Sequence, residues 1–210
     1  FKRLEDHFLG ESEHHGTGGG WRIEAPRLSW AVLDAVAEAA HEMGIRKTPD
    51  FNTGDNEGIG YFHVNQKRGR RWSSARGFLK PALTRPNLRL ETDVLVHKII
   101  VENGRATGVR FRQGGETVEA FAKGEVILCS GSVGSTQVLH RSGIGPQDWL
   151  APLGIETVLD RQGVGRNLQD HLQQRAIYKV EGVRTLNETY YNLFRRGWMG
   201  VDYLLRRRGP

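Results

Sequence analysis

Three features of the sequence predict a mixed α/β fold. Residues 88–131 hold short alternating apolar runs separated by glycine-containing turns, which is typical of a β-meander. Residues 126–129 are continuously apolar and lead into a turn of small residues and a helical pattern. Near residues 30–43, apolar side chains recur at helical spacing. No internal repeat interrupts the chain, so one continuous piece of mixed architecture is expected.

Composition narrows the class of protein. The 210 residues are 38% hydrophobic, which is ordinary for a globular chain with one large domain or two small ones. The net charge of +6 comes from 30 basic residues dispersed among 24 acidic ones, so no basic stripe predicts nucleic acid as a partner. No apolar run approaches the ~20 residues of a membrane span. We expect a cytoplasmic protein, with peripheral association to the inner membrane as an option.

The N-terminal elements are predicted from local patterns. Residues 1–8 have the pattern of the last turns of a helix. In the glycine-rich loop that follows, His14 and His15 lack partners at ligand spacing, so a solvated loop is favoured over a metal site. Ser29 is expected to cap a helix that ends at Gly44. Residues 50–60 are turn-formers, and residues 61–65 are a strand candidate.

The meander is predicted from its turns. Strand patterns at 94–96 and 99–101 lead to Asn103-Gly104, a pair favoured where a tight hairpin needs positive φ, and the return strand carries Val109 and Phe111. A second turn at residues 113–116 leads to another strand.

The apolar run at 126–129 predicts a strand covered on both faces. Cys129 at its end cannot form an internal disulfide, and a buried structural thiol is favoured over a reactive one. A small-residue turn at 130–135 and a helical pattern at 136–141 follow. Such a turn can present backbone N–H groups and a helix dipole to a phosphate, or it can serve packing alone. Both readings stay open.

The stretch Gly131–Gly145 (GSVGSTQVLHRSGIG) resembles the second signature of the glucose-methanol-choline oxidoreductases. Other segments resemble landmarks of that family in the family's order, most securely from about Arg27 to His171. They are Asp50-Phe51-Asn52, Gly58-Ile59-Gly60, residues 71–75, Phe78-Leu79, Pro86-Asn87-Leu88 and residues 163–171. Within that family, the general sequence pattern is most similar to that of the choline dehydrogenase-like branch.

This resemblance implies an FAD-dependent dehydrogenase or oxidase that passes hydride from a small alcohol to flavin N5, with a quinone-type compound or oxygen as electron acceptor. It implies a Rossmann-like FAD-binding domain with an inserted β-meander over residues 59–171. Residues 1–58 would form a linking segment and part of a substrate-binding domain, and residues 172–210 would begin the second part of that domain.

The resemblance also implies cofactor contacts. Val96 matches a position whose backbone meets the adenine, and Ser130 with Gly131 would lie near the nucleotide. Asp170 and His171 match a segment close to the flavin. Adjacent residues of an extended segment point to opposite faces, so we favour a supporting role for this pair over acid–base catalysis. No catalytic residue and no metal ligand is assigned.

Two family elements are not found in the sequence: a Gly-x-Gly-x-x-Gly turn after a first strand, and the C-terminal histidine base. We therefore expect an internal fragment that neither holds FAD tightly nor turns over substrate alone. The alternative is a non-catalytic basic module, which would use Arg195-Arg196 and residues 206–208 to bind acidic partners or an anionic membrane. Strong salt-dependent retention on an anionic matrix would favour it.

Overall fold

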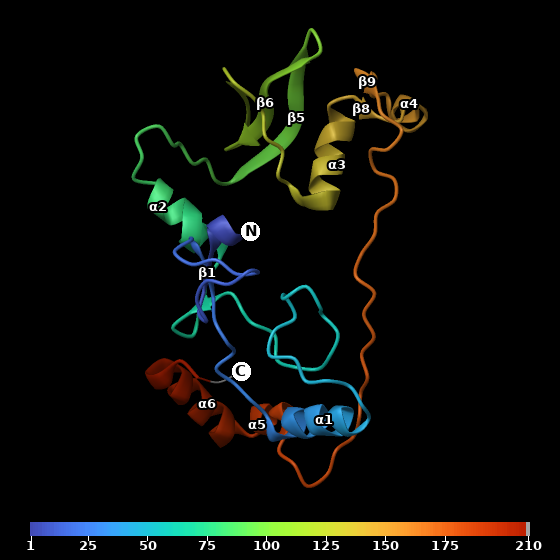
Figure 1. The fold of residues 1–210 in the computed structure, drawn as a ribbon. Helices are drawn as coiled ribbons and strands as arrows, with labels where there is room; N and C mark the ends of the chain where they lie inside the picture. Colours follow the sequence, from blue (N-terminus) through green and yellow to red (C-terminus); the bar gives the residue numbers. More distant parts are fainter. Residues whose placement is uncertain (209–210) are drawn as a thin grey trace. The chain divides into compact units, whose positions relative to one another are not determined.

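The computed structural model describes residues 1–208, which form two compact units (Figure 1). One unit comprises Phe1–Arg89 together with the chain from Ile177 onward, and the other comprises Leu90–Ala176. Helices and short sheets occur in both, so the predicted mixed α/β class is confirmed. None of the described helices is long and apolar enough to cross a bilayer.

The sheet of the second unit is the predicted β-meander. Strands β5 (Val94–Glu102), β6 (Arg105–Gln113) and β7 (Glu116–Phe121) pair antiparallel in the order β5-β6-β7. Asn103 and Gly104 have φ angles of 51° and 75°, and Gly114 and Gly115 have φ angles of 59° and 95°. Both turns thus use the positive φ that their residues favour, which confirms the two hairpins.

Helix α3 (Gly131–Arg141) packs against β5 in this unit, as Figure 1 shows. Short elements follow: β8 (Ile144–Gly145), α4 (Gln147–Leu150), a 3₁₀ turn (Ala151–Leu153) and β9 (Leu159–Asp160), with β8 and β9 parallel. The buried apolar side chains among the described residues all belong to this unit, and they are Ile99, Phe111, Val138, Pro146 and Leu150. The core thus lies between the meander and the elements after it.

The first unit has little regular sheet. Its elements in chain order are a 3₁₀ helix (Lys2–Leu4), β1 (Glu5–His7), β2 (Trp21–Ile23), α1 (Ala31–Glu42), β3 (Gln66–Lys67), β4 (Arg70–Arg71), a π-helical turn (Ala75–Leu79), α2 (Lys80–Ala82), α5 (Leu186–Tyr191) and α6 (Leu193–Arg206). Strands β1 and β2 pair parallel, and β3 and β4 pair antiparallel. A capping box at Thr185 begins α5, and the side chain of Asn192 caps α6.

The interior of the first unit is polar. Its buried side chains are those of His7, His15, Thr48 and Asp50. Buried polar groups need hydrogen-bond partners, and each of these has at least one. Polar contacts between distant segments therefore take the place that apolar packing has in the second unit.

Several local predictions for the first unit are wrong. Residues 1–8 form a 3₁₀ turn and strand β1 in place of a helix, because β1 pairs with β2 across the intervening loop. Helix α1 begins after Trp30, whose backbone N–H donates to the Tyr61 hydroxyl, so Ser29 is not the cap. In residues 61–65 only Val64 pairs, through an isolated bridge to Glu24.

The predicted buried strand at 126–129 is also not formed. These residues have no regular secondary structure, and Ile127 is 74% exposed. Cys129 is exposed as well, which contradicts the expectation of a buried thiol. The physical reason is the lack of a neighbouring strand for this segment within residues 1–208, since an apolar run becomes a buried strand only where a sheet receives it.

Candidate functional site

The N-terminus of α3 is the centre of the predicted nucleotide site. Ser130 is the N-cap residue, its side chain makes no capping hydrogen bond, and the first turn carries no acidic side chain. The first N–H groups of a helix lack intrahelical acceptors and carry a partial positive charge. This end of α3 therefore offers donors that suit a phosphate or another electron-rich ligand group.

Gly131 combines a special backbone conformation with open space. Its φ is 76°, in the left-handed region that an L side chain rarely adopts, and a Cβ built at this residue would meet no atom within 4 Å. Packing of the described chain thus does not explain the glycine, whereas close approach of a ligand to the backbone would use the space. Serine and glycine at 130 and 131 fit such a contact.

Val96 lies on β5, in the same unit as the start of α3. It pairs with Phe111, and the next registered pair is Lys98 with Arg110, so His97 is an extra residue in a β-bulge. Strand β5 is at the edge of its sheet, which leaves backbone groups on its outer side without a strand partner. An edge backbone that offers both N–H and C=O matches the donor and acceptor edge of an adenine ring.

A buried serine links β5 to α3 through two hydrogen bonds. The hydroxyl of Ser142, directly after α3, accepts a hydrogen bond from the Ile99 amide at 2.8 Å and donates one to the Val138 carbonyl at 2.6 Å. Ser142 belongs to the closing Ser-Gly-Ile-Gly of the signature stretch. The sequence resemblance therefore has a structural basis, because this residue joins the strand of Val96 to the helix of Gly131.

Asp170 and His171 belong to the C-terminal segment of the same unit. Both are exposed, in a segment between β9 and α5 for which no helix or strand is described. The His171 amide donates to Asp170 Oδ1 at 2.8 Å, and no hydrogen bond or ion pair within residues 1–208 joins either side chain to Val96, Ser130 or Gly131. All five predicted residues thus belong to one unit, but Asp170 and His171 form no described site with the other three.

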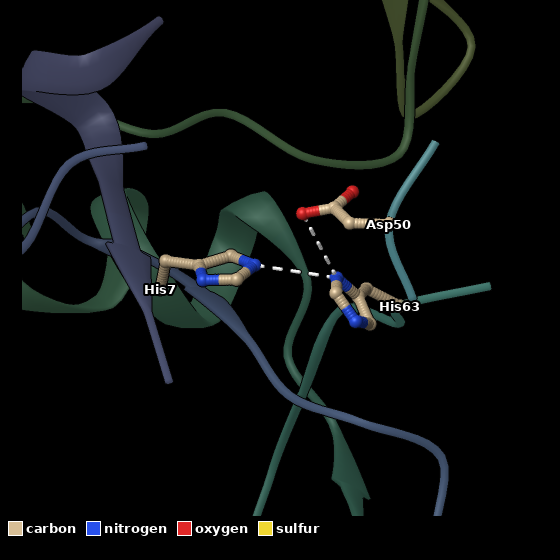
Figure 2. Close-up of side chains that lie close together, drawn as sticks. All are labelled: His7, Asp50 and His63. Carbon is tan, nitrogen blue, oxygen red and sulfur yellow. Dashed lines mark hydrogen bonds and ion pairs between the residues drawn. The ribbon is translucent and has the colours of Figure 1, made fainter. Parts of the chain in front are cut away.

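A second cluster, in the first unit, escaped the sequence analysis. Its members, called the histidine cluster below, are Glu5, His7, His15, Asp50 and His63, and Figure 2 shows three of them. His15 Nε2 lies 2.7 Å from Asp50 Oδ2, and His15 Nδ1 lies 3.1 Å from Glu5 Oε2. The prediction of a solvated loop is thus wrong for His15, which is 7% exposed, although His14 is exposed.

Burial and neighbouring charges set the ionisation of the histidine cluster. Burial and the adjacent His15 lower the pKa of His7, whose ring stacks on that of His15 with centroids 3.8 Å apart. Burial alone would raise the pKa of Asp50, but the Asn52 amide and the rings of His15 and His63 outweigh it and leave the pKa below its usual value. Asp50 is therefore a carboxylate near neutral pH.

Three of the five basic residues of the alternative hypothesis contact local partners. Arg206 lies 3.4 Å from Asp202 one helical turn away. The guanidinium groups of Arg196 and Arg207 lie over the rings of Tyr190 and Tyr203, at 5.6 and 5.4 Å from the centroids. No observation on this surface favours a dedicated anionic partner.

Comparison with protein families gives one match that covers most of the chain. The model described as GMC oxidoreductase matches residues 22–173. An oxygen-dependent choline dehydrogenase of Sinorhizobium fredii is 39% identical over 201 residues, which are 96% of this chain and 36% of the relative. That of Burkholderia thailandensis is 42% identical over 175 residues, which are 82% of this chain and 31% of the relative. The chain thus spans about a third of the length of these curated relatives.

Solved structures share the fold. Pyridoxine 4-oxidase from Mesorbium loti has a TM-score of 0.77 and 34% sequence identity, with 81% of this chain and 34% of that chain covered. An FAD-dependent oxidoreductase from Chaetomium thermophilum has a TM-score of 0.85 and 22% identity, with 100% of this chain and 39% of that chain covered. The second likeness concerns the fold alone.

Proposed function

The chain belongs to the GMC oxidoreductases, and we propose on this basis that the whole protein is an FAD-dependent enzyme that oxidises the CH–OH group of a small alcohol. The observation that carries the proposal is the family match over residues 22–173, supported by relatives at 38–42% identity named oxygen-dependent choline dehydrogenase. FAD, when bound, supplies the hydride acceptor of the reaction.

The part of this chain in that reaction is to hold the cofactor. We propose that the backbone at Ser130 and Gly131 lies against the nucleotide half of FAD, where the Ser130 N–H now donates to Ser135 Oγ at 3.1 Å, and that the backbone of Val96 meets the adenine. The positive φ and the open space at Gly131 support the first contact, and the edge position of β5 supports the second. Asp170 and His171 are proposed to support the flavin half, where they would position other groups without accepting the substrate proton.

The domain assignment follows the same proposal. Residues 59–171 would contribute mainly to FAD binding, and residues 1–58 and 172–210 to the substrate-binding part. The two ends of the chain fall in one unit, which supports their common part, but that unit extends to Arg89 and so also includes residues 59–89. We propose a cytoplasmic enzyme, and fractionation of cells into soluble and membrane pools would test peripheral association with the inner membrane.

The first experiment is to express the complete reading frame that contains this chain and to record flavin absorbance, with the released cofactor identified by chromatography. A yellow protein that contains FAD and oxidises an alcohol is expected. Choline is tested first and pyridoxine second, because the chain aligns with proteins named choline dehydrogenase and pyridoxine 4-oxidase. Oxygen uptake is compared with reduction of a quinone under anaerobic conditions. A colourless, well-folded long form would contradict the proposal.

Gly131→Ala tests the proposed nucleotide contact. A left-handed conformation costs an L residue about 1–2 kcal/mol, so FAD retention should fall roughly tenfold. Gly124→Ala is the matched control, because a Cβ there also meets nothing within 4 Å and no positive φ is involved. Equal FAD content in the two variants would remove Gly131 from the site.

A further inference from the structure

We propose that His7, Asp50 and His63 form a binding site for a divalent transition-metal ion of the zinc type. The three residues come from strand β1 and two loops, and their side chains converge as Figure 2 shows. Their ligand atoms all lie within 4.8 Å of one another. Imidazole nitrogens with one carboxylate oxygen are a donor set that suits zinc, and three protein ligands leave a fourth position for water.

The spacing of the ligand atoms fits tetrahedral coordination. With bonds of about 2.0–2.1 Å, two ligand atoms of a tetrahedral zinc ion lie about 3.3 Å apart. His7 Nε2 and His63 Nδ1 are 3.3 Å apart, and His63 Nδ1 and Asp50 Oδ2 are 3.7 Å apart. Both distances are long for hydrogen bonds, whose usual length is about 2.9–3.0 Å for a nitrogen donor. The third pair, His7 Nε2 and Asp50 Oδ2, lies within 4.8 Å, so side-chain shifts that close this separation would surround an ion.

Neighbouring groups orient the carboxylate ligand. Asp50 Oδ1 accepts the Asn52 amide at 2.8 Å, which leaves Oδ2 directed at the histidines. His15 Nε2 contacts that Oδ2 at 2.7 Å, and Glu5 Oε2 in turn holds His15 Nδ1 and the Gly16 amide. Hydrogen-bonded groups behind a ligating carboxylate are typical of metal sites, where they fix its direction.

Coordination would replace the hydrogen bond between His7 Nε2 and His63 Nδ1 and would change one further contact of His7. His7 Nδ1 now lies 3.4 Å from the Leu9 amide, which requires the ring proton on Nε2. Binding through Nε2 moves that proton to Nδ1, so the Leu9 contact is given up. Because this hydrogen bond is long, it is weak, and losing it costs little free energy compared with the metal–nitrogen bond that forms.

The location explains what an ion would do for the fold. The histidine cluster occupies the interior of a unit whose buried side chains are polar. His7, Asp50 and His63 lie on segments up to 56 residues apart, so one ion would fasten three distant parts of the chain. Metal binding that is absent from the unfolded chain adds directly to stability. The histidines also line a cavity of about 590 Å³, which gives an ion and its water a route to the ligands.

The test uses the purified protein after treatment with a chelator. Zinc is titrated with elemental analysis as the readout, and cobalt(II) is titrated with its visible d–d absorption as a report of tetrahedral geometry. A single equivalent of metal, an intense tetrahedral cobalt spectrum and a higher thermal midpoint in zinc are expected. Weak octahedral absorption without a defined stoichiometry would overturn the proposal.

Variants separate this site from adventitious binding. His63→Gln and the isosteric Asp50→Asn should lose the stoichiometric equivalent, whereas His41→Gln, which removes an exposed histidine of α1, should retain it. His15→Gln keeps the three ligands and removes a group behind them, so its affinity should fall about 10–100-fold. Circular dichroism before metal addition checks that each variant folds. Retention of the cobalt spectrum by folded His63→Gln or Asp50→Asn would refute the assignment. The measurement needs neither bound FAD nor enzyme activity.

Discussion

Ser142→Ala should loosen the joint between the meander and α3. The Ser142 side chain is 6% exposed, and its hydroxyl is the acceptor for the Ile99 amide of β5. Alanine has nearly the same size, so the substitution removes the oxygen and changes little else. The Val138 carbonyl keeps a partner, because the backbone N–H of residue 142 also donates to it at 3.1 Å. The Ile99 N–H is therefore the group left without an acceptor.

The cost follows from that single orphaned donor. A buried backbone N–H without an acceptor costs about 1–3 kcal/mol, since it gave up water in the folded state and gains nothing in return. Ile99 is 8% exposed, so water does not replace the hydroxyl without rearrangement. We expect a loss of about 2 kcal/mol in the second unit, which corresponds to roughly a thirtyfold rise in the population of opened states.

Hydrogen exchange of individual amides is the appropriate assay, because it reports each unit separately. The Ile99 amide should exchange roughly thirtyfold faster in Ser142→Ala. Ser132→Ala, an exposed serine in the first turn of the same helix, is the control and should change stability by less than about 0.5 kcal/mol. Unchanged exchange at Ile99, or equal effects of the two substitutions, would refute the reasoning.

Three further predictions concern other parts of the chain. Gly104→Ala should destabilise the first hairpin by about 1 kcal/mol because φ is 75°, measurable as a lower urea midpoint, and an unchanged midpoint would contradict it. Gly16→Ala should displace its loop, since a Cβ would meet a backbone carbonyl of the N-terminal 3₁₀ helix, and faster exchange of amides in β1 would reveal this. The Trp30 amide lowers the pKa of Tyr61, but loss of water and the hydrogen bond to Asp34 outweigh it, so the net pKa is raised. As pH rises, the phenol of Tyr61 ionises in the unfolded chain before it ionises in the folded one. The stability that Tyr61 contributes is therefore present below about pH 10, and it is lost as pH rises through the raised pKa of the folded state. Tyr61→Phe should show a shallower alkaline loss of urea midpoint, and identical slopes would argue against the assignment.

Local chemistry made part of this structure predictable. Asn103-Gly104 and Gly114-Gly115 favour positive φ whatever surrounds them, so the hairpins could be placed from the sequence. The apolar periodicity near residues 30–43 likewise located α1, although the cap was misplaced because Trp30 bonds to a distant hydroxyl. The stretch Gly131–Gly145 identified the family, whereas the cofactor roles of Val96, Ser130, Gly131, Asp170 and His171 remain predictions.

The sequence by itself determined the two hairpin turns, the helical patterns of α1 and α3 and the family, because each depends on residues that are close together in the chain. Only the tertiary structure decided the state of residues 126–129, where Ile127 and Cys129 are exposed because no strand within residues 1–208 receives this segment, and the change of residues 1–8 from a helix pattern to β1. It also decided the histidine cluster. His7, Asp50 and His63 carry no shared motif, and their meeting depends on chain closure between distant segments, which no local pattern encodes.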